Sequence, residues 1–242
     1  MNDAGRIDEG GIEEGGDGTT RSEVLLGLRL SLPAGLGMFP LGMAFGLLVI
    51  QQGLAWWMAP ALSFLAYAGS LELLLVGMIA TVTPLATIAV TTFLVNFRHV
   101  FYAFSFPLRV VRGRWARLYS MYALTDESYA VTAAAPGSWT HARLLATQVA
   151  FQVYWVGGGL AGVAVGSLLP GPIEGLEFAL CALFITLTLD ACRTREQVPS
   201  LLLAALSFAV AAVVTPGAVL FTALALFVGL LIGRYVLERV RA

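Results

Sequence analysis

The chain has 242 residues, of which 58% are hydrophobic and 12% charged, and its formal net charge is −1. A soluble domain usually carries about a quarter charged residues, so this composition excludes an ordinary soluble globular protein and indicates a chain whose solvent is lipid. A spanning helix needs about 20 apolar residues, and several uncharged runs reach that length: Leu30–Ile50, Leu73–Phe97, Leu144–Ile173 and Gln197–Gly233. The alternating segments of about ten residues that mark a β-barrel are absent. The sequence therefore predicts an all-α polytopic membrane protein.

The first 23 residues differ in composition from the rest. They hold seven acidic residues and two arginines, a balance of −5, whereas the rest of the chain holds eight acidic residues and twelve arginines, a balance of +4. They are also Gly-rich and nearly free of large apolar side chains, so they cannot bury enough surface to offset the entropy of ordering. We expect residues 1–23 to form a disordered acidic tail and residues 24–242 to form a single transmembrane transport domain.

Apolar segments predict about seven transmembrane helices in that domain. They lie at 24–50, 54–81, 84–107, 143–168, 175–191, 199–214 and 218–235. A turn at Thr215-Pro216-Gly217 separates the last two. Segment 118–134 is long enough to enter the membrane, but Asp126 and Glu127 interrupt it and Pro136-Gly137 follows.

Arginine placement decides between a span and a shorter excursion for segment 118–134. Arginines cluster at 109–117, at 193–195 and at the C-terminus, and cytoplasmic loops carry an excess of such residues. If 118–134 is a re-entrant or interfacial segment, all three clusters face the cytoplasm. This interpretation puts the N-terminus outside and the C-terminus inside, although Arg21 and Arg29 count against it.

The same spans suggest an internal repeat. Residues 24–107 and 143–214 each begin with a Gly-rich helix, pass a turn and continue through two helices. Two units of three spans in one chain must have opposite orientations, and inverted repeats are common in transporters. The sequence predicts an inverted repeat of three spans each, as a topological hint.

The first span contains a run of prolines and glycines that a lone helix would not tolerate. It includes Pro33, Gly37, Pro40 and Gly42. Irregular backbone at membrane depth needs protein or a water-filled cavity to satisfy it, so one interpretation is a broken helix whose free amides and carbonyls bind substrate. The alternative is a kinked helix with small residues for close packing.

The second span carries Gly69, Ser70 and Glu72. Glu72 lies deep in an otherwise uncharged stretch, where a charge costs roughly 2.5–3.5 kcal/mol. It is therefore a candidate substrate or proton site, and a protonated or paired structural Glu is the alternative.

The third span and the segment after the 109–117 arginines carry the remaining polar candidates. Helical geometry places Asn96 and His99 on one face and Arg98 and Tyr102 on another. Arg98 could clamp a carboxylate and His99 could gate protons near neutral pH, whereas a snorkelling arginine and a satisfied histidine are the alternatives. Thr125, Asp126 and Glu127 would cap an exposed helix or project into a permeation path if 118–134 is re-entrant.

Signatures of soluble enzymes are missing. The chain has no Walker A loop, no H-E-x-x-H, no C-x-x-C and no G-x-S-x-G. We predict no enzyme activity, no cofactor and no metal, and any transport must then be driven by an ion gradient, by exchange or by facilitated flow.

These segments together resemble the AzlC family of branched-chain amino acid permeases, which includes YgaZ and BrnF. The resemblance runs from about Gly27 to Asp190 and rests on an ordered set of short motifs: Pro40, Gly42, Phe45 and Gly46; Ala68-Gly69-Ser70; Asn96, Arg98, His99 and Tyr102; Thr125-Asp126-Glu127; and Gly175-Leu176-Glu177-Phe178-Ala179.

The resemblance implies the large subunit of a secondary exporter for branched-chain amino acids, and for some members also methionine. It also implies a small membrane partner of the AzlD type and a place in the inner membrane. The family usually has Gln at the position of Glu72 and Asp at that of Glu177. A non-transporting membrane scaffold or assembly subunit is the alternative function, and an intramembrane enzyme is a third, for which no nucleophile–base pair is visible.

Overall fold

The structure is a computed structural model that describes residues 15–135, 139–171, 198–217 and 219–241, together with isolated positions between 174 and 189. Within these residues the chain forms helices and no strand. The elements are α1 (Gly15–Gln51), α2 (Met58–Leu65), α3 (Gly69–Ala80), α4 (Leu85–Asn96), α5 (Arg98–Ser105), η1 (Leu108–Val110), α6 (Arg114–Tyr122), α7 (Asp126–Ala134), α8 (His141–Leu168), α10 (Val198–Val214) and α11 (Val219–Arg241). The predicted all-α fold class is confirmed.

Three helical stretches are long and apolar enough to cross a membrane: Thr20–Gln51, Leu85–Ser105 and His141–Leu168. Three shorter apolar helices accompany them, at Gly69–Ala80, Val198–Val214 and Phe221–Leu237. The predicted turn before the last helix is present at residues 216–217. The predicted span at 175–191, with Glu177, lies almost entirely outside the described residues.

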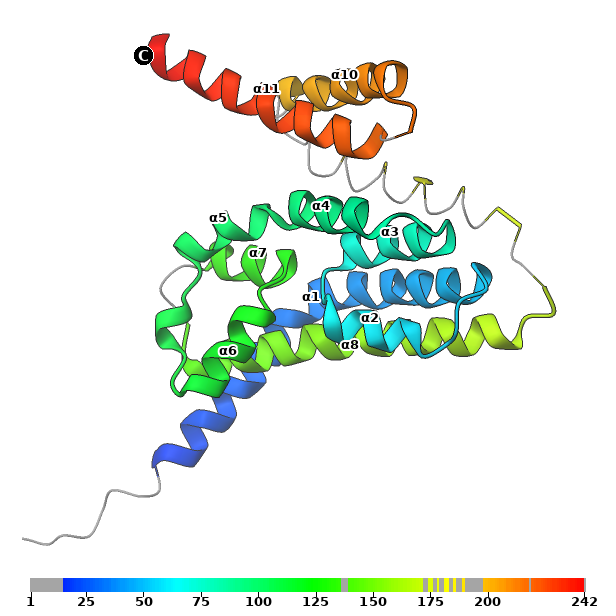
Figure 1. The fold of residues 1–242 in the computed structure, drawn as a ribbon. Helices are drawn as coiled ribbons and strands as arrows, with labels where there is room; N and C mark the ends of the chain where they lie inside the picture. Colours follow the sequence, from blue (N-terminus) through cyan, green and yellow to red (C-terminus); the bar gives the residue numbers. More distant parts are fainter. Residues whose placement is uncertain are drawn as a thin grey trace, which may run out of the picture.

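The long helices α1 and α8 lie side by side and run in the same direction (Figure 1). Thr147 of α8 donates to the backbone oxygen of Gly27 at 3.1 Å, and further along the pair a Cβ added at Gly42 would lie 2.6 Å from the backbone oxygen of Trp155. At Gly46 an added Cβ would collide with the backbone oxygen of Gly159. The two backbones therefore touch directly, an approach that small residues permit.

The prediction of a broken first span is wrong. Helix α1 continues through both Pro33 and Pro40 over 37 residues. Each proline deprives one backbone carbonyl of its helical partner, but the long contact with α8 holds the helix on both sides of these positions. Gly42 serves packing, as the alternative interpretation had it, and Gly37 has open space beside it.

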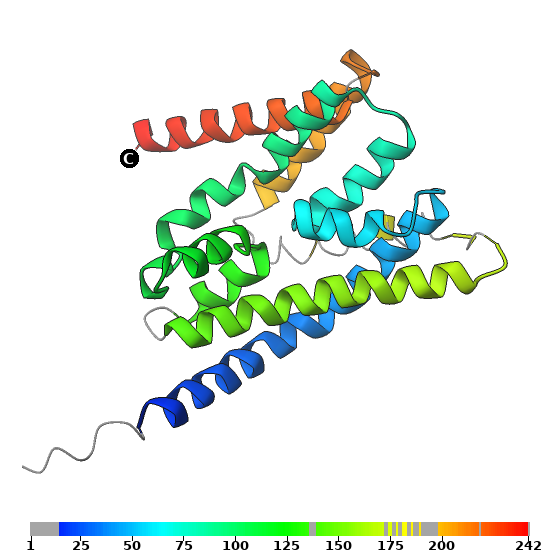
Figure 2. The same ribbon diagram turned by 60° about the horizontal axis from the view of Figure 1, so that its bottom comes forward.

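The interruption occurs instead in the predicted second span. Residues 54–81 form α2 and α3, with 8 and 12 residues, or roughly 12 and 18 Å at about 1.5 Å per residue. Neither helix can cross about 30 Å of hydrocarbon, and the chain turns back between them, so that α3 returns towards the end from which α2 came (Figures 1 and 2). The prediction of one continuous span at 54–81 is wrong, because Tyr67 adopts a left-handed φ of 41° at the turn.

Because of this hairpin, segments other than those that the sequence predicted lie at the same end of the bundle. Arg143 at the start of α8 forms an ion pair with Glu23 at 2.8 Å, and the backbone N–H of Arg112 donates to Nδ1 of His141 at 3.1 Å. The beginning of α1, the 109–117 arginines and the beginning of α8 therefore lie at one end of the bundle (Figure 2). The predicted placement of the N-terminus opposite the 109–117 arginines is not supported.

The parallel course of α1 and α8 also bears on the predicted repeat. These helices begin the two proposed halves, 24–107 and 143–214, and an inverted repeat requires them to run in opposite directions. They run in the same direction because the α2–α3 hairpin begins and ends at the same end of the bundle and so does not cross it. The structure therefore does not fit an inverted repeat with these boundaries.

We expect Gly46→Ala to destabilise the protein, because the new methyl group would meet the backbone of α8 and overpacking costs about 1–3 kcal/mol. Gly37→Ala is the matched control in the same helix, since nothing lies within 4 Å of that position and alanine is the better helix former. Thermal unfolding in detergent should show a lower Tm for Gly46→Ala alone. An equal Tm for both variants would contradict direct backbone contact between α1 and α8.

Candidate functional site

Three helix interruptions converge on one cavity. They lie between α2 and α3, between α4 and α5, and between α6 and α7. The cavity has a volume of about 420 Å³ and is lined by Ala66, Tyr67, Ala68, Asn96, His99, Ala103, Phe106, Leu108, Met121, Tyr122 and Leu124. Discontinuous helices whose ends surround a cavity are the usual construction of substrate sites in membrane transporters.

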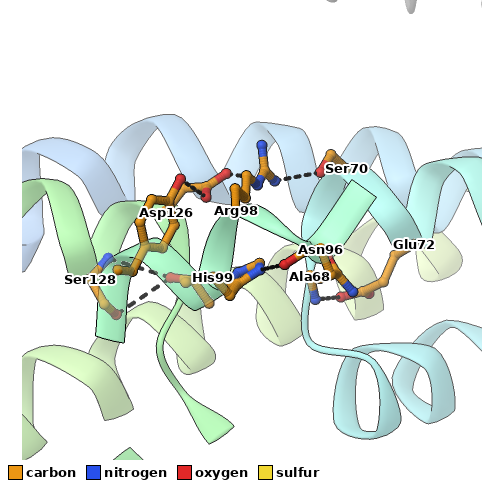
Figure 3. Close-up of polar contacts among 10 residues, drawn as sticks. Ala68, Ser70, Glu72, Asn96, Arg98, His99, Asp126 and Ser128 are labelled. Carbon is orange, nitrogen blue, oxygen red and sulfur yellow. Dashed lines mark hydrogen bonds and ion pairs between the residues drawn. The ribbon is translucent and has the colours of Figure 1, made fainter. Parts of the chain in front are cut away.

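Glu72 fixes the first interruption. Its carboxylate accepts from Ser63 Oγ of α2 at 2.7 Å, from the backbone N–H of Ala68 at 3.0 Å and from Trp155 Nε1 of α8 at 3.0 Å. The side chain is completely buried. A carboxylate accepts only, so three donors suit it, and the three bonds tie α2, the turn and α8 together (Figure 3 shows the bond to Ala68).

Trp155 and Gly69 complete this anchor. The indole ring lies directly under the first residue of α3, where a Cβ added at Gly69 would come within 2.8 Å of the ring. The ring also stacks on Phe45 of α1, with centroids 5.9 Å apart. The hairpin is thus seated on the α1–α8 pair through one buried aromatic residue.

Arg98 links three helices beside the cavity. Its NH2 group donates to Ser70 Oγ in the first turn of α3 at 2.9 Å and forms an ion pair with Asp126 Oδ2 at the start of α7 at 2.8 Å. Tyr102 donates to the other oxygen of Asp126 at 2.9 Å. Figure 3 shows Arg98 lying between Ser70 and Asp126.

Helices α3, α5 and α7 all begin in this region. The first N–H groups of a helix lack helical partners and its N-terminus carries a partial positive charge. In α7, Thr125 accepts from the backbone N–H of Ser128 at 3.4 Å and so caps the helix, as its residue type predicts. Together with the Arg98 guanidinium, these termini favour an anionic group, a role that Asp126 currently fills.

His99 and Asn96 form the polar wall of the cavity. Nδ1 of His99 lies 3.0 Å from the backbone oxygen of Asn96, an acceptor, so this nitrogen carries the proton. The imidazole packs edge-on against Tyr102 with centroids 5.4 Å apart. His99 therefore lines the cavity with its Nδ1 hydrogen-bonded, and its role in gating protons stays a prediction.

Some buried polar atoms at the site have no hydrogen-bond partner among the described residues: Tyr67 Oη, Asn96 Oδ1 and Arg98 Nε. Buried polar groups in native proteins are almost always paired, so each exception needs an explanation. A polar ligand in the cavity would supply one.

The predicted site residues separate into two groups. The structure gathers Gly69, Ser70, Asn96, Arg98, His99, Tyr102, Thr125 and Asp126 around the cavity and its rim. Pro33, Gly37, Pro40 and Gly42 lie on the continuous helix α1, and Glu127 is half-buried in the first turn of α7. Glu72 supports the site from behind and is absent from the cavity wall.

Sequence reasoning missed Tyr67 and Trp155. A left-handed φ at a tyrosine has no sequence signal, because the residues that favour it are glycine and asparagine. For Trp155 the sequence contains a weak signal. A buried indole needs an acceptor for its N–H, and Glu72 is an intramembrane acceptor that needs a donor.

Comparison with known proteins decides the family. Residues 33–169 match the family model described as AzlC protein. The chain belongs to the AzlC family. The resemblance seen in the sequence motifs is thereby confirmed.

Proteins similar to this chain come from several bacteria. An uncharacterized membrane protein of Helicobacter pylori is 31% identical over 158 residues, covering 64% of this chain and 69% of the relative. The branched-chain amino acid transport protein AzlC of Bacillus subtilis is 28% identical over 179 residues, covering 70% of each chain. The inner membrane protein YgaZ of Escherichia coli is 27% identical over 181 residues, covering 71% and 74%. No solved structure matches.

We expect Glu72→Gln to lower stability without changing the pH dependence of transport. The amide of glutamine has an oxygen that accepts and an NH2 group that donates. At least one of the three buried donors would then face the NH2 group without an acceptor, which lowers the free energy of unfolding by about 1–3 kcal/mol. Thermal unfolding and the pH profile of flux should be measured on the same preparations. A changed pH profile with unchanged Tm would make Glu72 a proton-coupling residue instead of an anchor.

Proposed function

We propose that this chain is the large subunit of a secondary exporter for branched-chain amino acids, with methionine as a further substrate. It works in the cell inner membrane with a small AzlD-like membrane subunit. The observation that carries the proposal is the cavity at three helix interruptions, which both polar and apolar side chains line. The name of the Bacillus subtilis relative supports the substrate class.

The cavity suits a small apolar amino acid. Its apolar wall includes Ala103, Phe106, Leu108, Met121 and Leu124, and such a wall would take an aliphatic side chain. Substrate pockets of about 300–1,000 Å³ are typical of small-molecule sites, and about 420 Å³ is near the lower end. A charged side chain would lose its hydration against this apolar lining, which is unfavourable.

Transport would require the contacts at the rim to rearrange. Arg98 and Asp126 join α5 to α7 and, through Ser70, to α3. A solute leaving the cavity between these helices must part them. The ion pair is therefore proposed as a gate, while α1 and α8 form the fixed part of the molecule.

The arginines give the orientation that we propose. The 109–117 cluster, Arg21 and Arg143 lie at the end where α1 begins, and α11 runs towards the same end with its own arginines (Figures 1 and 2). By the positive-inside rule this end is cytoplasmic, which places both the beginning of α1 and the C-terminus inside. The conflict that Arg21 and Arg29 raised in the sequence disappears.

Reconstitution tests the function. Proteoliposomes that hold this chain and an AzlD-like subunit should move labelled leucine, isoleucine, valine and methionine, and vesicles with either subunit alone should show background flux. Asp126→Asn with both subunits should lose most of the flux, because it removes the charge that pairs with Arg98. Background flux with both wild-type subunits would favour the scaffold function instead, and full leucine flux by this chain alone would refute the need for a partner.

Cysteine labelling in intact cells tests the orientation. In a chain with Cys181 and Cys192 replaced by serine, we expect single cysteines at Thr20 and Trp115 to resist an impermeant reagent until the cells are opened. A cysteine at exposed Gln52, at the other end of α1, should react from outside. Opposite labelling of Thr20 and Trp115 would restore the predicted outside N-terminus.

A further inference from the structure

Helix α6 turns an apolar ridge away from the bundle. Its inner face lies against α8 (Figure 1), where Gln148 Nε2 donates to the backbone oxygen of the completely buried Ser120 at 2.9 Å. On the outer face, the side chains of Trp115 and Leu118 are 75% and 50% exposed. Residues three apart on a helix are neighbours on its surface, so these two side chains form one ridge.

Arginines border this ridge. Arg109, Arg112, Arg114 and Arg117 are all exposed, and no acidic residue occurs from position 109 to position 125. None of the four forms an ion pair with another described residue. The guanidinium carbon of Arg114 lies 5.5 Å from the ring centroid of Trp115, so the positive charge lies at the ridge itself.

We propose that α6 is a binding site for anionic phospholipid. The lipid phosphate accepts from Arg114 and Arg117, and the acyl chains cover Trp115 and Leu118. Helices with basic residues beside exposed aromatic and aliphatic side chains lie in the interface of a membrane, and tryptophan is enriched at that depth. The lipid contact depends only on the membrane location of the chain, whereas its effect on transport rests on the proposed function.

The two features of the surface select a lipid among the possible occupants. The acidic residues 1–23 carry matching charge, but they are nearly free of large apolar side chains and offer nothing to cover Trp115 and Leu118. A zwitterionic lipid supplies acyl chains without net charge. An anionic phospholipid supplies both, and basic segments next to a membrane attract such lipids by about 1 kcal/mol for each arginine.

Helix α6 continues directly into the wall of the cavity. Met121 and Tyr122 form its last turn, and both line the cavity, as does Leu124. On the inner side Gln148 also donates to the backbone oxygen of Ala123 at 3.0 Å. The helix is thus held by α8 on one face and by lipid on the other, and in the proposed function the lipid keeps this wall in the position that transport requires.

Lipid binding is tested first, without reference to transport. The full chain in detergent is titrated with phosphatidylglycerol and with phosphatidylcholine of the same acyl chains, and bound lipid is counted by native mass spectrometry. We expect phosphatidylglycerol to bind more tightly, and its advantage to shrink as salt screens the charges. Equal binding of the two lipids would overturn the inference.

Arginine variants locate the contact on α6. The double variant Arg114→Gln and Arg117→Gln should bind phosphatidylglycerol roughly 30-fold more weakly, at about fivefold for each arginine. The double variant Arg114→Lys and Arg117→Lys keeps the charge and should bind as the wild type does. Arg239→Gln, which removes an exposed arginine of α11, is the matched control. An equal loss in the lysine variant or in the control would overturn the assignment to α6.

A fluorophore on α6 tests whether acyl chains cover the ridge. In a chain with Cys181 and Cys192 replaced by serine, a single cysteine at Leu118 is labelled and the protein is placed in nanodiscs that contain phosphatidylglycerol. Nitroxide lipids should quench the label more strongly than aqueous iodide does. Stronger quenching by iodide would show that the ridge faces water and would overturn the inference.

Flux in proteoliposomes tests the consequence for transport. With an AzlD-like subunit present, leucine flux by the wild type should fall when phosphatidylcholine replaces phosphatidylglycerol, and flux by the glutamine double variant should be low in both lipids. Equal wild-type flux in both lipids would overturn the control of transport by lipid. Tight phosphatidylglycerol binding without leucine flux in either lipid would leave the lipid site standing and overturn the proposed function.

Discussion

Backbone that leaves the helical pattern inside a bilayer has no water to satisfy its N–H and C=O groups. This constraint shapes the part of the molecule that surrounds the cavity. At the α2–α3 turn the Glu72 carboxylate accepts the N–H of Ala68, and at the start of α7 the hydroxyl of Thr125 accepts from Ser128. Near the α4–α5 interruption His99 bonds the backbone oxygen of Asn96. Each interruption has a side chain that makes it tolerable.

The two continuous helices also hold the interrupted helices in place. Helices α1 and α8 pack backbone to backbone through glycines and carry the hairpin through Trp155. Tyr67 at the hairpin turn adopts a conformation that costs of order 1–3 kcal/mol for a residue other than glycine. Such a conformation persists only where its surroundings enforce it, and the Glu72 bonds on three sides provide that enforcement.

Composition predicted the fold class and the long helices at 24–50 and 143–168, and it singled out Asn96, Arg98, His99 and Asp126 as candidate residues, although not that they lie close together. These predictions succeeded because uncharged runs and intramembrane polar residues are rare and specific signals. Those of a broken α1 and of one span at 54–81 failed for one reason. Prolines and glycines indicate where a helix can be interrupted, but packing decides where it is. Pro33 and Pro40 lie in a helix held by α8, whereas the turn at Ala66-Tyr67-Ala68 contains neither a proline nor a glycine.

The same error made the predicted topology wrong. When the hairpin at 54–81 is counted as one span, every later segment is assigned the opposite direction across the membrane. The error also hid the difference between the two acids of the site. Glu72 is fully buried and has three donors fixed on it, so any exchange of partner would leave buried donors empty. Arg98 and Asp126 keep 40% and 42% of their side chains exposed, and Arg98 has an unpaired nitrogen besides. In the proposed function, the depth of burial therefore favours Glu72 as the acid that holds the interrupted helices in place and Asp126 as the acid that changes partners.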